Sequence, residues 1–266
     1  MPDVCEPPPY AALEEAWERV SRTRDFALTR TPIVAGGESL LRIDIERRPE
    51  VPRIALSAGL HGDEPAAPWA LLSIARDGLL DRAFAYRIWC CTNPSGYRLG
   101  TRANASGEDV NRSFSHGGTT SEARAIVAAN DGLQFALSLD LHEDYEADGF
   151  YCYEPIVAGH APYGRRVVQA LDDAGFPVQE LDDAFDLGYP PDARELRSLE
   201  RGRCLPNVAA ELRHFEGLPY SMYMVSGNAR RTLTFESPRR LPWEARIAIH
   251  RTAVGSVLAT ARERLG

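Results

Sequence analysis

Hydrophobic and polar residues follow two patterns along this chain. Continuous apolar runs, or strict alternation of apolar and polar residues, predict strands at residues 38–48, 53–60, 85–93, 135–144 and 231–235. Apolar residues spaced three or four apart predict helices at residues 11–25, 66–78, 121–130 and 242–265. A middle section, from Tyr163 to Arg201, is predicted to be mostly helical, and residues 94–114 to be a long polar loop.

The order of these elements defines the expected fold class. Because strands alternate with helices, we expect an α/β fold with a mixed, mostly parallel sheet sandwiched between helices. No internal repeat or low-complexity linker interrupts the pattern, so residues 1–266 are predicted to form a single catalytic domain. Residues 1–35 are predicted to be an N-terminal helical extension of that domain.

Composition and charge exclude several classes of function. The net charge of −8 argues against nucleic-acid binding. All 30 cationic residues are arginine, so neither a Schiff-base lysine nor a P-loop lysine is available. The five cysteines lack CxxC spacing, which favours free thiols in a reducing compartment. Without a signal-peptide pattern or a membrane-length apolar run, the prediction is a cytoplasmic enzyme that does not bind membranes.

Polar side chains follow the apolar runs at the predicted carboxyl ends of strands. His61 and Glu64 come just after the run at residues 53–60, and His142 ends the "LSLDLH" segment. Open α/β sheets bind ligands at the carboxyl ends of their strands, so these segments have a physical reason to converge. Two histidines and one carboxylate are the ligand set of hydrolytic zinc sites. We therefore predict one zinc ion per chain, bound by His61, Glu64 and His142.

A hydrolytic zinc site also needs a base and positive charge. Glu236 directly follows the apolar strand "RTLTF", where it can accept and return the proton of a bound water. The loop "GTRANASGEDVNRSF" contains Arg102, Asn111 and Arg112. Arginine suits both a developing oxyanion and a substrate carboxylate, so this loop is a candidate functional loop.

These segments together resemble the M14 zinc metallocarboxypeptidases, in particular the small bacterial type, and the related succinylglutamate desuccinylase and aspartoacylase deacylases. "HGDE" resembles the HxxE zinc motif, "DLHE" the segment of the third ligand, and "TLTFES" the strand of the catalytic glutamate. "NPSGYRLGTRANASGEDVNRSF" resembles the bacterial NPxG and NRxF loop, and "MYMVSGN" the mobile tyrosine segment. The five pieces occur in the family's order.

The resemblance implies a role for each matching residue. It implies that Arg102 polarises the scissile carbonyl, that Asn111 and Arg112 hold the substrate carboxylate, and that Tyr223 closes over the substrate. Glu236 is implied to act first as the general base and then as the general acid. The segment between Tyr223 and Glu236 lines the specificity pocket in carboxypeptidases, so Arg230 (or its neighbour Arg231) is a hypothetical selector of acidic C-terminal side chains.

The expected activity is zinc-dependent removal of a C-terminal residue, with metal-activated water attacking the amide bond. The substrate is expected to be a small peptide or an N-acyl amino acid with a free carboxylate. An N-acyl amino acid deacylase of the succinylglutamate desuccinylase/aspartoacylase type remains an alternative, because its substrate is also an amide beside a carboxylate. A catalytically inactive metal- or peptide-binding module is a third hypothesis, and the retention of all three ligands together with Glu236 argues against it.

Overall fold

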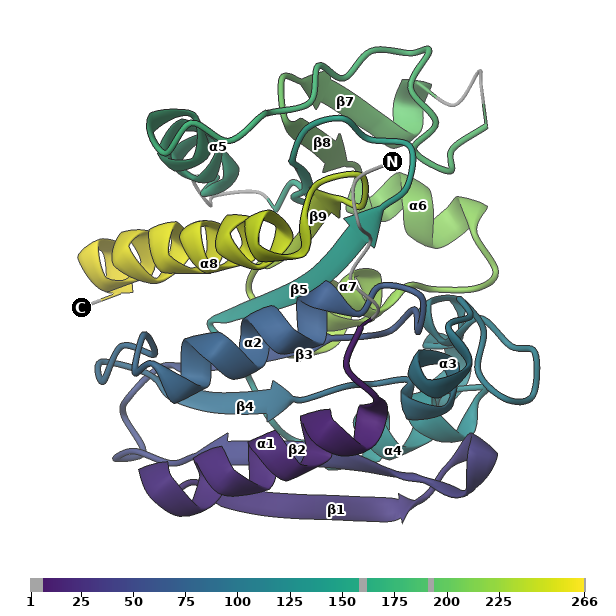
Figure 1. The fold of residues 1–266 in the computed structure, drawn as a ribbon. Coiled ribbons are helices and arrows are strands. Elements are labelled where there is room, and N and C mark those ends of the chain that lie inside the picture. The colour runs from purple at the N-terminus through teal and green to yellow at the C-terminus, as the bar shows by residue number, and fades with distance from the viewer. Residues whose placement is uncertain (1–6, 158–161, 191–193, 266) are drawn as a thin grey trace.

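A computed structural model describes residues 7–157, 162–190 and 194–265 as one α/β sandwich around a twisted nine-stranded sheet (Figure 1). The strand order is β1-β2-β4-β3-β5-β9-β6-β8-β7. The central strands β4, β3, β5 and β9 run parallel, whereas the flanking pairs are mainly antiparallel. The expectation of a mixed sheet between helices is confirmed, with the parallel part confined to the centre and to the β6–β8 pair.

The elements of the described chain are as follows. The strands are β1 (Ala27–Ile33), β2 (Ser39–Ile45), β3 (Arg53–Ala58), β4 (Ala85–Trp89), β5 (Leu137–Asp144), β6 (Tyr151–Tyr153), β7 (Arg197–Glu200), β8 (Arg203–Pro206) and β9 (Thr232–Pro238). The α-helices are α1 (Tyr10–Arg24), α2 (Ala66–Arg76), α3 (Pro94–Leu99), α4 (Ser121–Asn130), α5 (Gly164–Asp173), α6 (Val208–His214), α7 (Tyr220–Tyr223) and α8 (Trp243–Leu265).

Helices cover both faces of the sheet, and each face has its own apolar core. Helices α1, α2 and α8 pack on one face (Figure 1). There the side chains of Trp17, Leu71 and Val254 join the strand residues Ile54 and Leu56 in one buried cluster. On the opposite face, the buried cluster combines side chains of α4 and α7 with alternate strand residues such as Ala55 and Trp89. The apolar runs predicted as two-sided strands are therefore continuous because both of their faces are buried.

The parallel centre of the sheet fixes where polar strand ends meet. Strands β3, β5 and β9 are consecutive neighbours, and their carboxyl ends lie at the same edge of the sheet. The loops that follow β3 and β9 and the last residues of β5 therefore share this edge, as the sequence predicts. This edge positions the candidate site.

Two predicted segments differ from the structure. The described part of the predicted N-terminal extension, residues 7–35, belongs to the main domain: α1 packs into the main core and β1 is the edge strand of the sheet. The hydrophobic pattern does not predict strand β1, because β1 is an exposed edge strand that mixes apolar and polar residues. In the section from Tyr163 to Arg201, the described residues form the helix α5, a short 3₁₀ turn at Arg194–Leu196, strand β7 and irregular turns. Its acidic turns lack the apolar spacing that a second helix needs.

Two predictions from composition have structural counterparts. Cys90, Cys91, Cys152 and Cys204 are buried free thiols, and Cys5 lies outside the described residues. None of the helices in the described part of the chain has the length and apolarity required to cross a membrane.

Candidate active site

The turn after β3 carries His61 and Glu64 and is built by close backbone approach. A Cβ atom on Gly62 would lie 1.8 Å from the backbone carbon of Gly96, so only glycine fits between this turn and α3. Gly59 has a positive φ of 73°, which lets the chain leave the strand sharply. The turn then leads directly into α2 through Pro65, which has helical dihedral angles. Both side chains consequently point back toward the end of β5.

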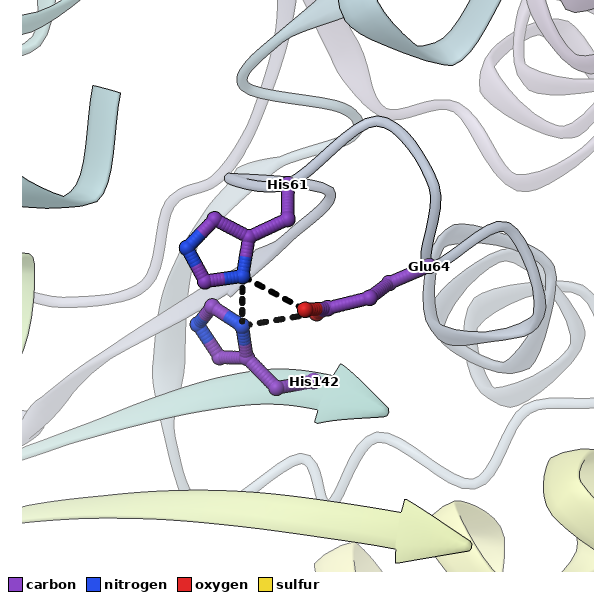
Figure 2. Close-up of side chains that lie close together, drawn as sticks. All are labelled: His61, Glu64 and His142. Atoms are coloured by element: carbon purple, nitrogen blue, oxygen red, sulfur yellow. Dashed lines mark hydrogen bonds and ion pairs between the residues drawn. The ribbon is translucent and has the colours of Figure 1, made fainter. Parts of the chain in front are cut away.

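The three side chains predicted as metal ligands converge at one point (Figure 2). His61 Nδ1 lies 2.5 Å from Glu64 Oε1, and His142 Nδ1 lies 2.8 Å from Glu64 Oε2. The two Nδ1 atoms are 3.2 Å apart. All three residues are at least 95% buried. Two imidazole nitrogens and a carboxylate that face one another in a dry setting form a ready set of metal ligands.

Asp140 fixes the orientation of His142. Its Oδ2 atom lies 2.9 Å from His142 Nε2, and its Oδ1 accepts a 2.6 Å hydrogen bond from the Ser57 hydroxyl. A carboxylate on Nε2 holds the proton there and directs the lone pair of Nδ1 toward the ligand cluster. Residues 140 and 142 face the same side of β5, because side chains alternate along a strand.

The charges in the cluster shift the pKa values of its members in opposite directions. Burial disfavours the charged form of His142, but Asp140 and Glu64 outweigh it and raise the pKa of His142 well above its usual value. Burial likewise acts to raise the pKa of Glu64, yet the two histidines hold that pKa below its usual value. In the absence of a metal, the cluster therefore retains a proton that a divalent cation would displace.

Glu143 ties the ligand cluster to two helices. Its carboxylate accepts a 2.7 Å hydrogen bond from the Ala66 amide at the start of α2 and a 2.5 Å charged bond from Arg246 of α8. The backbone N–H of Glu143 in turn donates to Glu64 Oε2 at 3.1 Å. The carboxylate of Glu143 is wholly buried, and burial raises its pKa, while the Arg246 guanidinium acts to lower that pKa and so favours the ionised form.

Glu236 lies beside His142 across the sheet. The two residues are register partners in the parallel β5–β9 pair, so their side chains leave the sheet on the same face. Burial raises the pKa of Glu236 well above its usual value, and the neighbouring carboxylates Glu64 and Asp144 add to this. A carboxylate with a raised pKa next to a candidate metal site has the properties of a general base.

The candidate arginine loop reaches the cluster through Arg102. Arg102 Nη1 lies 3.4 Å from His61 Nδ1, and Arg102 Nε donates to Asp109 Oδ2 at 3.0 Å. Asp109 Oδ1 is 3.6 Å from His61 Nε2. Burial acts to raise the pKa of Asp109, but His61 and Arg102 keep that pKa below its usual value. Asp109 therefore links the guanidinium to the first histidine.

Asn111 and Arg112 line the same cleft. Asn111 Oδ1 accepts a 2.9 Å hydrogen bond from the backbone N–H of Tyr220, which leaves its amide nitrogen as the group able to donate to a ligand. The side chain of Arg112 is exposed, and its Nη1 donates a 2.9 Å hydrogen bond to the backbone carbonyl of the preceding residue, Asn111. A carboxylate in the cleft would find an amide donor and a guanidinium side by side.

A cleft of about 340 Å³ joins these groups. His61, Glu64, Arg102, Asn111, Arg112 and Glu236 all line it. Its far wall comes from segments around β6, β8 and α6, and the wall residues include Tyr153, Tyr189, Glu211 and Phe215. The volume is that of a small-molecule or short-peptide site.

Two predicted substrate-binding residues lie elsewhere. Tyr223 is outside the cleft lining and stacks on Phe114, with ring centroids 5.6 Å apart, as part of the apolar core on the α4 and α7 face. Arg230 precedes β9, and its backbone N–H bonds to the Phe135 carbonyl at the amino end of β5. It therefore lies at the end of the sheet opposite the cleft, as a correction to its expected place in a specificity pocket.

Sequence reasoning missed Asp140, Asp109 and the Glu143–Arg246 pair. The sequence could have indicated Asp140, because a carboxylate two residues before a histidine on a strand lies on the same face of the sheet as that histidine. Asp109 had a weaker signal, because it caps the short 3₁₀ turn that holds Asn111. The partner of Glu143 could not be found locally, because Arg246 lies 103 residues away on another element.

The donor set fits a zinc ion. His61, Glu64 and His142 each offer a ligand atom, and these atoms all lie within 4.8 Å of one another. Three protein ligands with one face open to a cleft are the pattern of catalytic rather than structural zinc. Asp140 supplies the outer carboxylate that orients a zinc-ligating histidine in such sites.

Part of the chain matches a known catalytic domain and a curated relative. Residues 50–180 match the model of the succinylglutamate desuccinylase/aspartoacylase catalytic domain. Murein peptide amidase A of Escherichia coli K12 is 44% identical over 57 residues, a match that covers 21% of this chain and 23% of that protein. The match thus spans less than a quarter of this curated relative.

Solved structures share the fold over nearly the whole chain. A Shewanella amazonensis protein assigned to the metallopeptidases superposes with a TM-score of 0.75 at 22% identity, covering 94% of this chain and 92% of that one. Carboxypeptidase A from Helicoverpa armigera superposes with a TM-score of 0.67 at 14% identity, covering 96% of this chain and 73% of that one. Residues 50–180, just under half of the chain, therefore resemble the succinylglutamate desuccinylase/aspartoacylase catalytic domain, and the chain shares its fold with solved metallopeptidases and carboxypeptidases.

Proposed function

We propose that this protein is a zinc-dependent hydrolase that cleaves the C-terminal amide bond of a small peptide. The observation that carries the proposal is the convergence of His61, Glu64 and His142, with Glu236 in register beside His142. These groups stand at the mouth of one cleft with Arg102 and the Asn111–Arg112 pair. The arrangement supplies a metal site, a base and a carboxylate site, which are the parts that amide hydrolysis requires.

Each side chain has a defined task in this proposal. Zinc, when bound by His61, Glu64 and His142, would make a coordinated water acidic and polarise the amide carbonyl. Glu236 accepts a proton from the attacking water and delivers it to the departing amine. Because its pKa is raised, Glu236 has a higher affinity for a proton than an ordinary carboxylate, which suits a group that first accepts and then donates that proton.

The arginines orient the substrate and balance the developing charge. Arg102, fixed by Asp109, places its guanidinium where the carbonyl oxygen gains negative charge. The amide nitrogen of Asn111 and the Arg112 guanidinium bind the terminal carboxylate, which would hold the scissile bond near the cluster of His61, Glu64 and His142. Tyr223 has no part in this scheme, because it packs in the core.

An N-acyl amino acid deacylase is the second candidate. It is favoured by the match to the succinylglutamate desuccinylase/aspartoacylase catalytic domain. Its substrate carries the amide and the carboxylate in the same relation, so the same residues would serve both reactions. The two activities differ in the group on the acyl side of the bond.

Metal content, followed by turnover of paired substrates, tests the proposal. We expect one zinc per chain in the purified protein and its loss in His142→Ala. We expect the zinc-loaded enzyme to hydrolyse a blocked dipeptide faster than N-acetylaspartate or N-succinylglutamate; the reverse order would favour the deacylase. Glu236→Gln should keep its zinc and lose about 10²–10⁴-fold in kcat, whereas Glu244→Gln, an exposed glutamate on α8, should match the wild type.

Two results would contradict the proposal. The first is undiminished hydrolysis by Glu236→Gln, which would remove the general base from the mechanism. The second is a metal-free protein that cannot be reconstituted with zinc, which would show that the three ligands serve another purpose.

A further inference from the structure

Beyond Glu236, the cleft extends into a chamber lined by Thr234, Tyr153, Tyr189 and Glu211. Thr234 precedes Glu236 by two positions on β9, so both side chains face the cleft. The Thr234 hydroxyl oxygen is buried and has no hydrogen-bond partner in the described part of the molecule. Tyr153 is the register partner of Thr234 on β6 and also lines the chamber. A buried, unpartnered hydroxyl on a cleft wall is available to bond a ligand that enters this space.

Glu211 is the charged group of this chamber. It lies on α6, lines the cleft and is only 4% exposed. The phenol hydroxyl of Tyr189, also a lining residue, donates a short hydrogen bond to its Oε1 atom. Within residues 7–157, 162–190 and 194–265, no arginine or histidine forms an ion pair with Glu211. This carboxylate is therefore almost wholly removed from water, and its hydrogen-bond partner Tyr189 is neutral.

The groups around Glu211 offset only part of the free-energy cost of burying its charge. Burial raises the pKa of Glu211 to about 7, although the Tyr189 hydrogen bond and the charge of Arg112 act to lower it. A nine-tenths buried carboxylate costs free energy unless a charge partner is supplied. The open side of Glu211 faces the cleft, and the charge of Arg112 offsets its burial only in part, so a cationic group of a ligand can supply the missing partner.

We propose that Glu211 selects a substrate whose released amino acid has a side chain ending in an ammonium group. The inference rests on the proposed function, because it places the terminal carboxylate at Asn111 and Arg112 and the scissile bond at the metal cluster. The side chain then extends past Thr234 toward Glu211, where the ammonium donates to the carboxylate and the Thr234 hydroxyl accepts a second bond. An acidic side chain would instead meet Glu211 as a like charge, contrary to the selection of acidic residues expected for Arg230.

The test compares substrates that differ only at the side-chain terminus. Blocked dipeptides ending in lysine, norleucine and glutamate are assayed with the zinc-loaded enzyme and with Glu211→Gln. We expect the wild type to prefer lysine over norleucine by about tenfold or more in kcat/KM, since a charged hydrogen bond contributes roughly 1.5–3 kcal/mol. The preference should appear mainly in KM, and glutamate should be the poorest of the three. In Glu211→Gln the ratio of lysine to norleucine should fall to about one, whereas Glu216→Gln, an exposed neighbour of α6, should keep the wild-type ratio.

A second measurement uses the wild type alone, so that the proposal can be tested even if Glu211→Gln does not fold. Free lysine should inhibit the enzyme as a product at about tenfold lower concentration than free norleucine. Equal turnover of lysine and norleucine substrates, or an unchanged preference in folded Glu211→Gln, would overturn the assignment while leaving the proposed hydrolysis intact. If the zinc-loaded enzyme hydrolysed none of the three, both this inference and the peptidase function would fail.

Discussion

Removing the charge of Arg246 should destabilise the protein and weaken its metal site together. In Arg246→Met the methylene volume is kept, while the 2.5 Å charged bond to Glu143 Oε1 is lost. Glu143 would remain fully buried with the Ala66 amide as its hydrogen-bond donor and Arg239 at 3.6 Å as its nearest cation. Breaking one side of a buried ion pair costs roughly 3–5 kcal/mol. Because Arg239 compensates in part, we expect a loss of about 3 kcal/mol.

Urea denaturation of the zinc-free protein measures this loss directly. With an m value of about 3 kcal/mol per molar, the midpoint should fall by about 1 M. Arg251→Met is the matched control, because Arg251 lies on the same helix but pairs with Asp77 at the surface, where a pair contributes roughly 0–1 kcal/mol. The double variant Glu143→Gln/Arg246→Met should recover more than 1 kcal/mol of the loss, since it removes the unpaired buried charge.

The same variant reports on the metal site through the backbone of Glu143, whose N–H donates to Glu64 Oε2. Zinc affinity in Arg246→Met should fall by about tenfold or more, as it does when a ligand's outer support is removed. The reasoning is refuted if Arg246→Met costs no more than Arg251→Met, or if the double variant is no more stable than the single one.

Two further outcomes follow from the ligand cluster. Asp140→Asn should retain the fold and lose roughly 10–100-fold in zinc affinity, because the carboxylate that fixes the tautomer of His142 is gone. Competition with a chromophoric chelator measures this affinity. Asp148→Asn, which changes an exposed aspartate, is the control. The chelated protein should be most stable between about pH 4.5 and 6.5, measured as Tm from pH 4 to 9. The raised pKa of His142 adds stability that is full below its ordinary pKa of 6.5 and is lost at higher pH, whereas the lowered pKa of Glu64 adds stability that is full above its ordinary pKa of 4.5 and is lost at lower pH. A Tm that rose steadily from pH 6.5 to 9 would contradict this assignment.

The metal ligands and the central strands were predictable because their signals are local. A continuous apolar run marks a strand buried on both faces, and parallel neighbours bring their polar ends to one edge whatever the loop lengths between them. His61, Glu64, His142 and Glu236 all lie at such ends. The flanking glycines were less informative: nothing in "HGDE" shows that Gly62 is required by the backbone of Gly96.

The misplacement of Arg230 has a simple geometric cause. It lies six residues before Glu236, and a strand rises about 3.3 Å per residue, so an extended chain puts the two about 20 Å apart. A residue that precedes a parallel strand belongs to the amino end of the sheet, away from the cleft. Glu211 was unpredictable for the opposite reason, because its position depends on how α6 packs against the short 3₁₀ turn at Arg194–Leu196 after the irregular segments that follow β6.

The two halves of the sheet therefore carry different parts of the chemistry. The parallel strands β3, β5 and β9 fix the metal ligands and Glu236 through the strand register itself, so few substitutions there are compatible with a working site. The wall that meets them comes from short strands, turns and α6, and it contains Tyr189 and Glu211. Such a wall can change its charge without moving a ligand, because no ladder hydrogen bond of β3 or β5 passes through it. A common hydrolytic centre could thus serve both peptides and acyl amino acids, with the choice made by residues such as Glu211.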